Sequence, residues 1–168
     1  MDDRAFEALF RDHYSALASF AVRYVRDPAL AEELVQDLFA DLWTRRTTWA
    51  PRPGSERAYL LAATRNRALN LRKRQAIERD WEAEEAVADV RELHPRPTPA
   101  DHALESAELA RQVHAALESL PERCRLVMHL RWREQLSYAQ IAEVMGISVK
   151  GVENQLARGL KALRERLL

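Results

Sequence analysis

Apolar side chains recur every three or four residues along most of the chain, which is the spacing of one face of an α-helix. One such segment covers about residues 3–25. A second follows Asp27-Pro28, where the aspartate can cap a helix and the proline suits its first turn. A third is expected over residues 55–79, after a loop that contains prolines and a glycine. The pattern predicts an all-helical N-terminal domain over residues 1–79.

Helical periodicity stops between residues 80 and 99. This segment is acidic and ends in HPRPTP, where three prolines prevent a continuous helix. We therefore expect a flexible acidic linker at residues 80–99 and a second helical domain at residues 100–168. A cap over Thr98–Asp101 is expected to begin the first helix of that domain, which should end near Ser119.

The C-terminal segment carries the most specific pattern. Residues 137–140 (SYAQ) predict a capping box at the start of a short helix, and Gly146 fits the left-handed position that ends it. Ser148 can then cap a second helix. The apolar residues expected on the buried face of that helix are Val152, Leu156, Leu160, Leu163 and Leu167. The chain is thus predicted to be all-α, with two small helical domains and a C-terminal helix-turn-helix.

A helix-turn-helix places the exposed start of its second helix in the major groove of DNA. The residues predicted to face outward there are Ser148, Lys150, Gly151, Glu153, Asn154 and Arg158. Lysine and arginine suit phosphates or guanine, and asparagine suits adenine. An ordinary helical hairpin with a solvated polar face is the alternative. The agreement between the caps, the turn glycine and the basic second helix favours DNA binding.

The charge distribution is uneven, although the net charge is zero from 26 basic and 26 acidic residues. A zero total argues by itself against a protein that coats nucleic acid. However, residues 64–75 contain basic side chains and no acidic one, whereas acids predominate in residues 79–110. This distribution predicts local basic surfaces for nucleic acid on an otherwise balanced chain.

The sequence has no pattern typical of catalysis or metal binding. It contains no phosphate-binding loop and no nucleophile elbow, and Cys124 as the only cysteine allows neither an internal disulfide nor a cysteine-based zinc site. We expect a protein that is not an enzyme and needs no cofactor or metal. The acidic start and the lack of an apolar run near the roughly 18 residues of a membrane span predict a cytoplasmic protein without membrane insertion.

Two parts of the chain resemble bacterial sigma factors, most closely the extracytoplasmic-function group. Residues 117–168 are similar to the domain that reads the promoter −35 element. The stretch DPALAEELVQDLFADLW resembles the helix that docks on the largest polymerase subunit, and AYLLAATRNRALNLRKR resembles the helix that melts and reads the −10 element. The resemblance implies that core RNA polymerase, promoter DNA and an anti-sigma factor are partners. It also implies that −10 is read as a single strand and −35 as a duplex.

The resemblance carries specific residues with it. The polymerase-docking face would consist of Glu33, Gln36, Asp37, Phe39 and Trp43, although either aromatic residue could belong to the core instead. The −10 residues would be Trp49, Arg65, Asn66, Arg67, Asn70, Arg72, Lys73 and Arg74. The basic side chains would hold phosphates and an asparagine could bind an extruded base. Trp49 could stack on that base or pack on its own loop.

Several positions depart from the family pattern. Asn70 stands where an acid is common, and Gly151 stands where threonine or serine is usual, which removes a DNA contact. Gly159 has no explanation in the sequence and should weaken its helix by up to ~1 kcal/mol relative to alanine. Two other functions remain open: a dimeric helix-turn-helix regulator that never binds polymerase, and a helical interaction protein with no DNA role.

Overall fold

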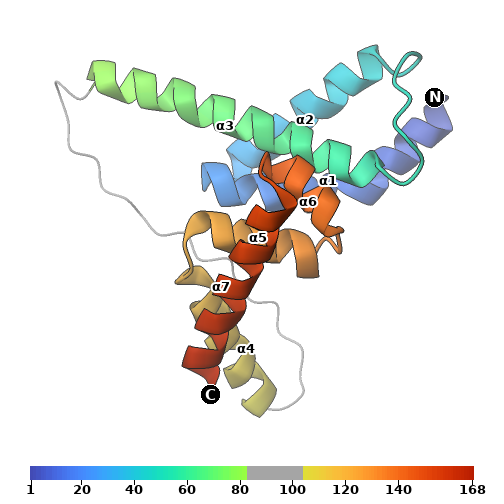
Figure 1. Cartoon of the computed structure of the whole chain (residues 1–168). Coiled ribbons are helices and arrows are strands. Elements are labelled where there is room, and N and C mark those ends of the chain that lie inside the picture. The colour runs from blue at the N-terminus through green and yellow to red at the C-terminus, as the bar shows by residue number, and fades with distance from the viewer. Residues whose placement is uncertain (83–103) are drawn as a thin grey trace. The chain divides into compact units, whose positions relative to one another are not determined.

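The computed structural model describes residues 1–82 and 104–168, and in that part of the chain it contains seven α-helices and no strand (Figure 1). The chain divides into two compact units, Met1–Leu93 and His94–Leu168. The helices are α1 (Asp3–Val25), α2 (Pro28–Thr44), α3 (Glu56–Glu82), α4 (Leu104–Glu118), α5 (Glu122–Trp132), α6 (Tyr138–Met145) and α7 (Val149–Leu167). The predicted all-α class is confirmed. Most of the predicted linker, and the predicted cap at Thr98–Asp101, lie outside the described residues.

Local capping explains where the first two helices begin and end. The Asp2 carboxylate accepts a hydrogen bond from the Ala5 amide at 2.8 Å, and Arg26 ends α1 in the left-handed conformation. The Asp27 carboxylate accepts from the amides of Ala29 and Leu30 at 2.9 and 3.3 Å. The predicted cap at Asp27-Pro28 is therefore confirmed.

The first unit is a three-helix core in which α1 packs against both α2 and α3 (Figure 1). Its fully buried side chains come from all three helices and include Leu17, Phe20, Leu38, Leu42, Leu60 and Leu61. Thr64 is buried among them, and its hydroxyl donates to the Leu60 carbonyl at 2.8 Å, so it adds no unpaired polar group. This core holds α2 and α3 against α1 and leaves their outer faces to solvent.

The helix-turn-helix of the second unit forms as predicted. Ser137 accepts from the Gln140 amide at 3.2 Å, while the Gln140 side chain accepts from the Ser137 amide at 3.0 Å, which completes the capping box. Gly146 takes the left-handed conformation with φ 63°. Ser148 caps α7 by accepting from the Gly151 amide at 3.0 Å. Shortly before this motif in the chain, the buried side chains of His129 and Glu134 approach each other, with Nε2 and Oε1 3.2 Å apart.

The buried face of α7 differs from the prediction at one position. Leu160 is 40% exposed, whereas its neighbour Gly159 is buried. The face that packs inward consists of Val152, Leu156 and Gly159, followed by the half-buried Leu163. Gly159 faces inward because α5 approaches α7 closely at this position, where the side chain of a leucine would overlap Met128.

Gly159 makes room for the close contact between α5 and α7. A Cβ atom at this position would collide with the Met128 thioether and lie 3.1 Å from Cys124 Sγ. The Cys124 thiol donates to the Gln155 carbonyl at 3.2 Å, and burial raises the pKa of this thiol. The glycine that the sequence left unexplained thus allows α5 to set the position of the second helix of the helix-turn-helix.

Candidate polymerase- and promoter-binding sites

The proposed docking face lies on α2, and four of its five predicted residues are exposed. Glu33, Gln36, Asp37 and Trp43 reach solvent, whereas Phe39 is only 3% exposed. Phe39 shares the inner face of α2 with Val35 and Leu42, which are also buried. Of the two alternatives left open for Phe39, the structure favours the core, from which its side chain supports the exposed residues of α2.

Aromatic residues of α1 surround Phe39 and extend to the surface. The Phe39 ring centroid lies 4.9 Å from that of Phe10, 6.0 Å from that of Phe6 and 6.4 Å from that of Tyr14. Phe6 also contacts Trp43 edge to face, with centroids 4.9 Å apart. Edge-to-face pairs of this kind fix the rings relative to one another. The result is an aromatic cluster of α1 and α2 that includes the partly exposed rings of Phe10 and Trp43.

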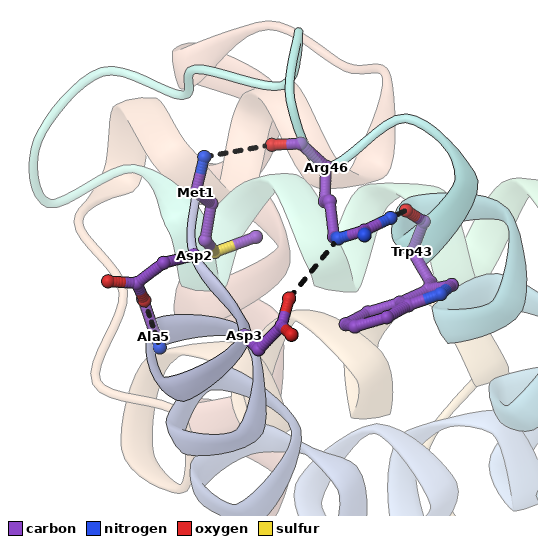
Figure 2. Close-up of polar contacts among 6 residues, drawn as sticks. All are labelled: Met1, Asp2, Asp3, Ala5, Trp43 and Arg46. Carbon is purple, nitrogen blue, oxygen red and sulfur yellow. Dashed lines mark hydrogen bonds and ion pairs between the residues drawn. The ribbon is translucent and has the colours of Figure 1, made fainter.

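Arg46 lies over the exposed end of this cluster (Figure 2). The Arg46 guanidinium carbon is 3.8 Å from the centre of the Trp43 ring, and Arg46 Nη1 donates to the Trp43 carbonyl at 3.0 Å. Asp3 holds the same guanidinium through an ion pair of 3.6 Å, and the Met1 amine donates to the Arg46 carbonyl at 3.0 Å. Arg46 is not among the residues identified from the sequence, and it lies in the turn after α2, so helical periodicity did not indicate its contact with Trp43.

The proposed −10 residues lie on α3, and most of them are solvent-exposed. Those that reach solvent fully are Asn66, Asn70, Arg72, Lys73 and Arg74. Arg65 and Arg67 are only half-buried, and the buried Nε atom of Arg65 has no hydrogen-bond partner within the described residues. Asn66, Asn70 and Lys73 follow at steps of four and three residues, so α3 presents them on one stripe.

Arg67 is engaged by a carboxylate of α2. Its guanidinium donates to Asp41, which connects α3 to α2. This hydrogen bond, together with the charge of Arg67, holds the pKa of the Asp41 carboxyl below its ordinary value of 3.8. The sequence did not indicate this pair, because the two residues are distant along the chain and their meeting depends on the packing of the two helices.

Trp49 lies in the loop before α3, where it packs against the first turn of that helix. Its ring centroid is 5.5 Å from that of Tyr59, with an angle of 50° between the planes. The Trp49 side chain is half-buried, and Tyr59 is exposed. Both rings thus lie together at the start of α3, and Trp49 remains partly exposed to solvent.

The proposed −35 residues surround the start of α7. Lys150, Asn154 and Arg158 follow one another at steps of four residues and are all exposed, which places them on one stripe. Lys150 Nζ forms an ion pair with Glu153 at 3.2 Å. Ser148 uses its hydroxyl oxygen to cap the helix, and Gly151 is half-buried beside it. The stripe of three residues is therefore the part of α7 whose exposed polar groups are suited to base edges and phosphates, with Lys150 already paired to Glu153.

Residues 1–82 and 104–168 contain no group of three or more His, Cys, Asp or Glu side chains that could hold a metal ion. Within the same ranges, none of the helices combines the length and the apolar character that crossing a membrane requires.

Comparison with known proteins identifies both units. The model of Sigma-70 region 2 matches residues 9–77, and that of Sigma-70 region 4 matches residues 110–163. The chain is 27% identical to the ECF RNA polymerase sigma factor SigK of Mycobacterium sp. (strain KMS), over 99% of this chain and 84% of the relative. It is also 27% identical to the ECF RNA polymerase sigma factor SigX of Bacillus subtilis (strain 168), over 98% of this chain and 84% of the relative.

Two solved structures have a similar fold. The sigma factor RpoE of Bartonella quintana, crystallised with the anti-sigma factor NepR, matches with a TM-score of 0.73 and 21% identity, over 98% of this chain and 97% of RpoE. CnrH, solved with the cytosolic domain of CnrY, matches with a TM-score of 0.61 and 26% identity, over 99% of this chain and 89% of the other. The two region matches and the full-length similarity to SigK and SigX show that the chain belongs to the extracytoplasmic-function group of the sigma-70 family.

Proposed function

We propose that this sigma factor, which directs bacterial RNA polymerase to promoters, divides the task among three helices. α2 docks on core polymerase, α3 holds the −10 element as a single strand, and α7 reads the −35 element as a duplex. The observation that carries this assignment is the order of the two region matches, because region 2 falls on α1–α3 and region 4 falls on α4–α7. The polar stripes of α3 and α7 supply the groups that each DNA element requires.

Capture of the −10 strand explains how a protein without an ATP-driven step can favour open DNA. Extruding a base costs a few kcal/mol, roughly, which phosphate contacts and base stacking can offset. Asn66 and Asn70 present amides on the outer face of α3, Lys73 and Arg74 can neutralise phosphates, and Trp49 offers a ring. In this proposal the catalysis of RNA synthesis belongs to the polymerase, and the chain contributes binding alone.

We also propose that an anti-sigma factor holds this chain inactive in the cytoplasm, where core polymerase works. The support is the structure of RpoE, which was crystallised with its anti-sigma factor NepR. The partly exposed aromatic cluster of α1 and α2 is suited to protein partners, because aromatic side chains are enriched in the cores of protein interfaces. An inhibitor that covered this cluster would prevent polymerase from docking there.

The alternative of a dimeric helix-turn-helix regulator explains less of the chain. Such a regulator needs a sensor or dimerisation domain beside its DNA-binding module. The first unit instead matches Sigma-70 region 2, and it carries the basic residues of α3 that a duplex-binding dimer does not need.

Run-off transcription with purified core polymerase tests the proposal. Reconstituted with this chain, the polymerase should give transcripts from a defined set of promoters, and permanganate should detect unpaired thymines at −10 only when both proteins are present. A palindromic duplex footprint by the chain alone, without specific transcripts, would instead support the dimeric regulator.

A further inference from the structure

We infer that Arg46 is a positioning residue for polymerase docking, because it holds the Trp43 ring in the orientation that the partner meets. This inference rests on the proposed docking role of α2. Trp43 is the largest exposed side chain of that face, with 39% of its surface open to solvent. A large ring at an interface contributes most when it is already held in its bound orientation, since no rotamer freedom is then lost on binding.

The geometry around Trp43 restrains the ring on two sides. Arg46 covers one face at 3.8 Å, and Phe6 of α1 meets the ring edge to face at 4.9 Å with an interplanar angle of 72°. Trp43 nevertheless keeps 39% of its surface exposed to solvent. The Trp43 side chain is therefore exposed enough to contact a partner but has little freedom to turn.

Arg46 is itself fixed, which makes it a support rather than a mobile cover. Arg46 Nη1 donates to the Trp43 carbonyl at 3.0 Å, and Arg46 Nε lies 3.6 Å from an Asp3 carboxylate oxygen (Figure 2). Only 30% of the Arg46 side chain is exposed. A planar guanidinium can stack on the indole and bind both groups at once, which the point charge of a lysine ammonium cannot do.

Affinity for core polymerase provides the first measurement, with full-length variants and a fluorescent label distant from α2. The Arg46→Ala variant lacks the cation that stacks on Trp43. Its affinity for core polymerase should therefore be about three- to tenfold lower than that of the wild type. Arg46→Lys should fall between this variant and the wild type, and it keeps the inference testable if Arg46→Ala is unstable. Arg45→Ala is the matched control, because Arg45 is an adjacent exposed arginine whose side chain donates to the Asp41 carbonyl at 3.5 Å. It should bind core polymerase with wild-type affinity.

A double-mutant cycle separates positioning from direct contact. In a Trp43→Ala background, Arg46→Ala should cause no further loss of core affinity, because the ring that Arg46 orients is absent. In the uncomplexed protein, Arg46→Ala should shift the indole N–H resonance of Trp43, while that of Trp132 in the other unit stays unchanged.

Three results would overturn the inference: wild-type affinity of Arg46→Ala, full affinity of Arg46→Lys, or an equal loss from Arg46→Ala with and without Trp43. Failure of the proposed docking function would look different. In that case the wild-type chain itself would not bind core polymerase, although its indole resonances and its −35 duplex binding would be normal.

Discussion

At the scale of single residues, the two glycines of α7 have opposite structural roles. Gly159 is buried where α5 approaches, and a Cβ atom there would collide with Met128. Gly151 lies near the start of the helix, where a Cβ atom would lie 3.3 Å from the Ser148 hydroxyl and otherwise make ordinary contacts. The same substitution at these two positions should therefore affect stability in different directions.

We expect Gly159→Ala to destabilise the second unit by about 1–2 kcal/mol, because overpacking against Met128 outweighs the higher helix propensity of alanine. Gly151→Ala should be neutral or stabilise by up to about 1 kcal/mol. Urea unfolding, monitored by circular dichroism, measures the free energy of unfolding of both variants. Equal stability of the two variants would show that α5 can move away from α7 without loss.

The Asp41–Arg67 pair predicts a specific dependence on pH. Because Arg67 lowers the pKa of Asp41 in the folded chain, the pair stabilises the fold above the ordinary carboxyl pKa of 3.8. That contribution is lost as the pH falls through the folded-state value. NMR titration of the carboxyl groups should give a pKa of Asp41 below 3.8 in the wild type. This pKa should rise in Arg67→Ala, and it should rise by less in Arg45→Ala. An unchanged Asp41 pKa in Arg67→Ala would contradict the pairing.

At the scale of helices, the sequence predicted those features that depend on local chemistry. The caps at Asp27, Ser137 and Ser148 and the left-handed Gly146 are present, because each depends on hydrogen bonds or backbone conformation within a few residues. Helical periodicity likewise located α1, α2, α3 and α7.

Features that depend on a neighbouring helix were not predictable in this way. The inward face of α7 passes through Gly159 instead of Leu160 because of Met128 on α5, and Phe39 is buried because aromatic residues of α1 cover it. Arg67 meets Asp41, and Arg46 meets Asp3, across distances along the chain that no periodic pattern encodes. Tertiary packing therefore determines which polar residues of the candidate sites remain free for a partner.

The exposed stripe of α7 predicts how salt should affect −35 binding. A phosphate contact releases counterions, so Arg158→Ala should weaken duplex binding and flatten the slope of log K against log[salt] by about one unit. Lys150→Ala should have a smaller effect, because Glu153 already neutralises part of that charge at 3.2 Å. Binding isotherms over a range of salt concentrations provide the measurement. A slope that neither variant changes would place α7 outside the groove.

At the scale of the whole molecule, the proposed function combines separate contacts to one promoter. Its net charge is zero, so it lacks the general attraction to DNA of a strongly basic protein. Attaching the chain to polymerase would raise the effective concentration of both DNA-reading helices at the promoter, which increases the combined affinity without any new contact. Specific promoter binding should therefore depend on polymerase docking far more than on the charge of the free chain.

Charge reversal on α2 should separate polymerase docking from −35 duplex binding. Asp37 is exposed on α2, and Asp37→Arg would place a cation where the partner meets an acid, so we expect core binding and run-off transcription to be lost. The full-length variant should still bind a −35 duplex with wild-type affinity and salt dependence, since α6 and α7 belong to the other compact unit. Asp12→Arg, a reversal at another exposed acid of the first unit, is the matched control and should retain core binding. Retained core affinity in Asp37→Arg would show that polymerase docks on a different face, whereas parallel loss of −35 binding would show that the two units do not act independently.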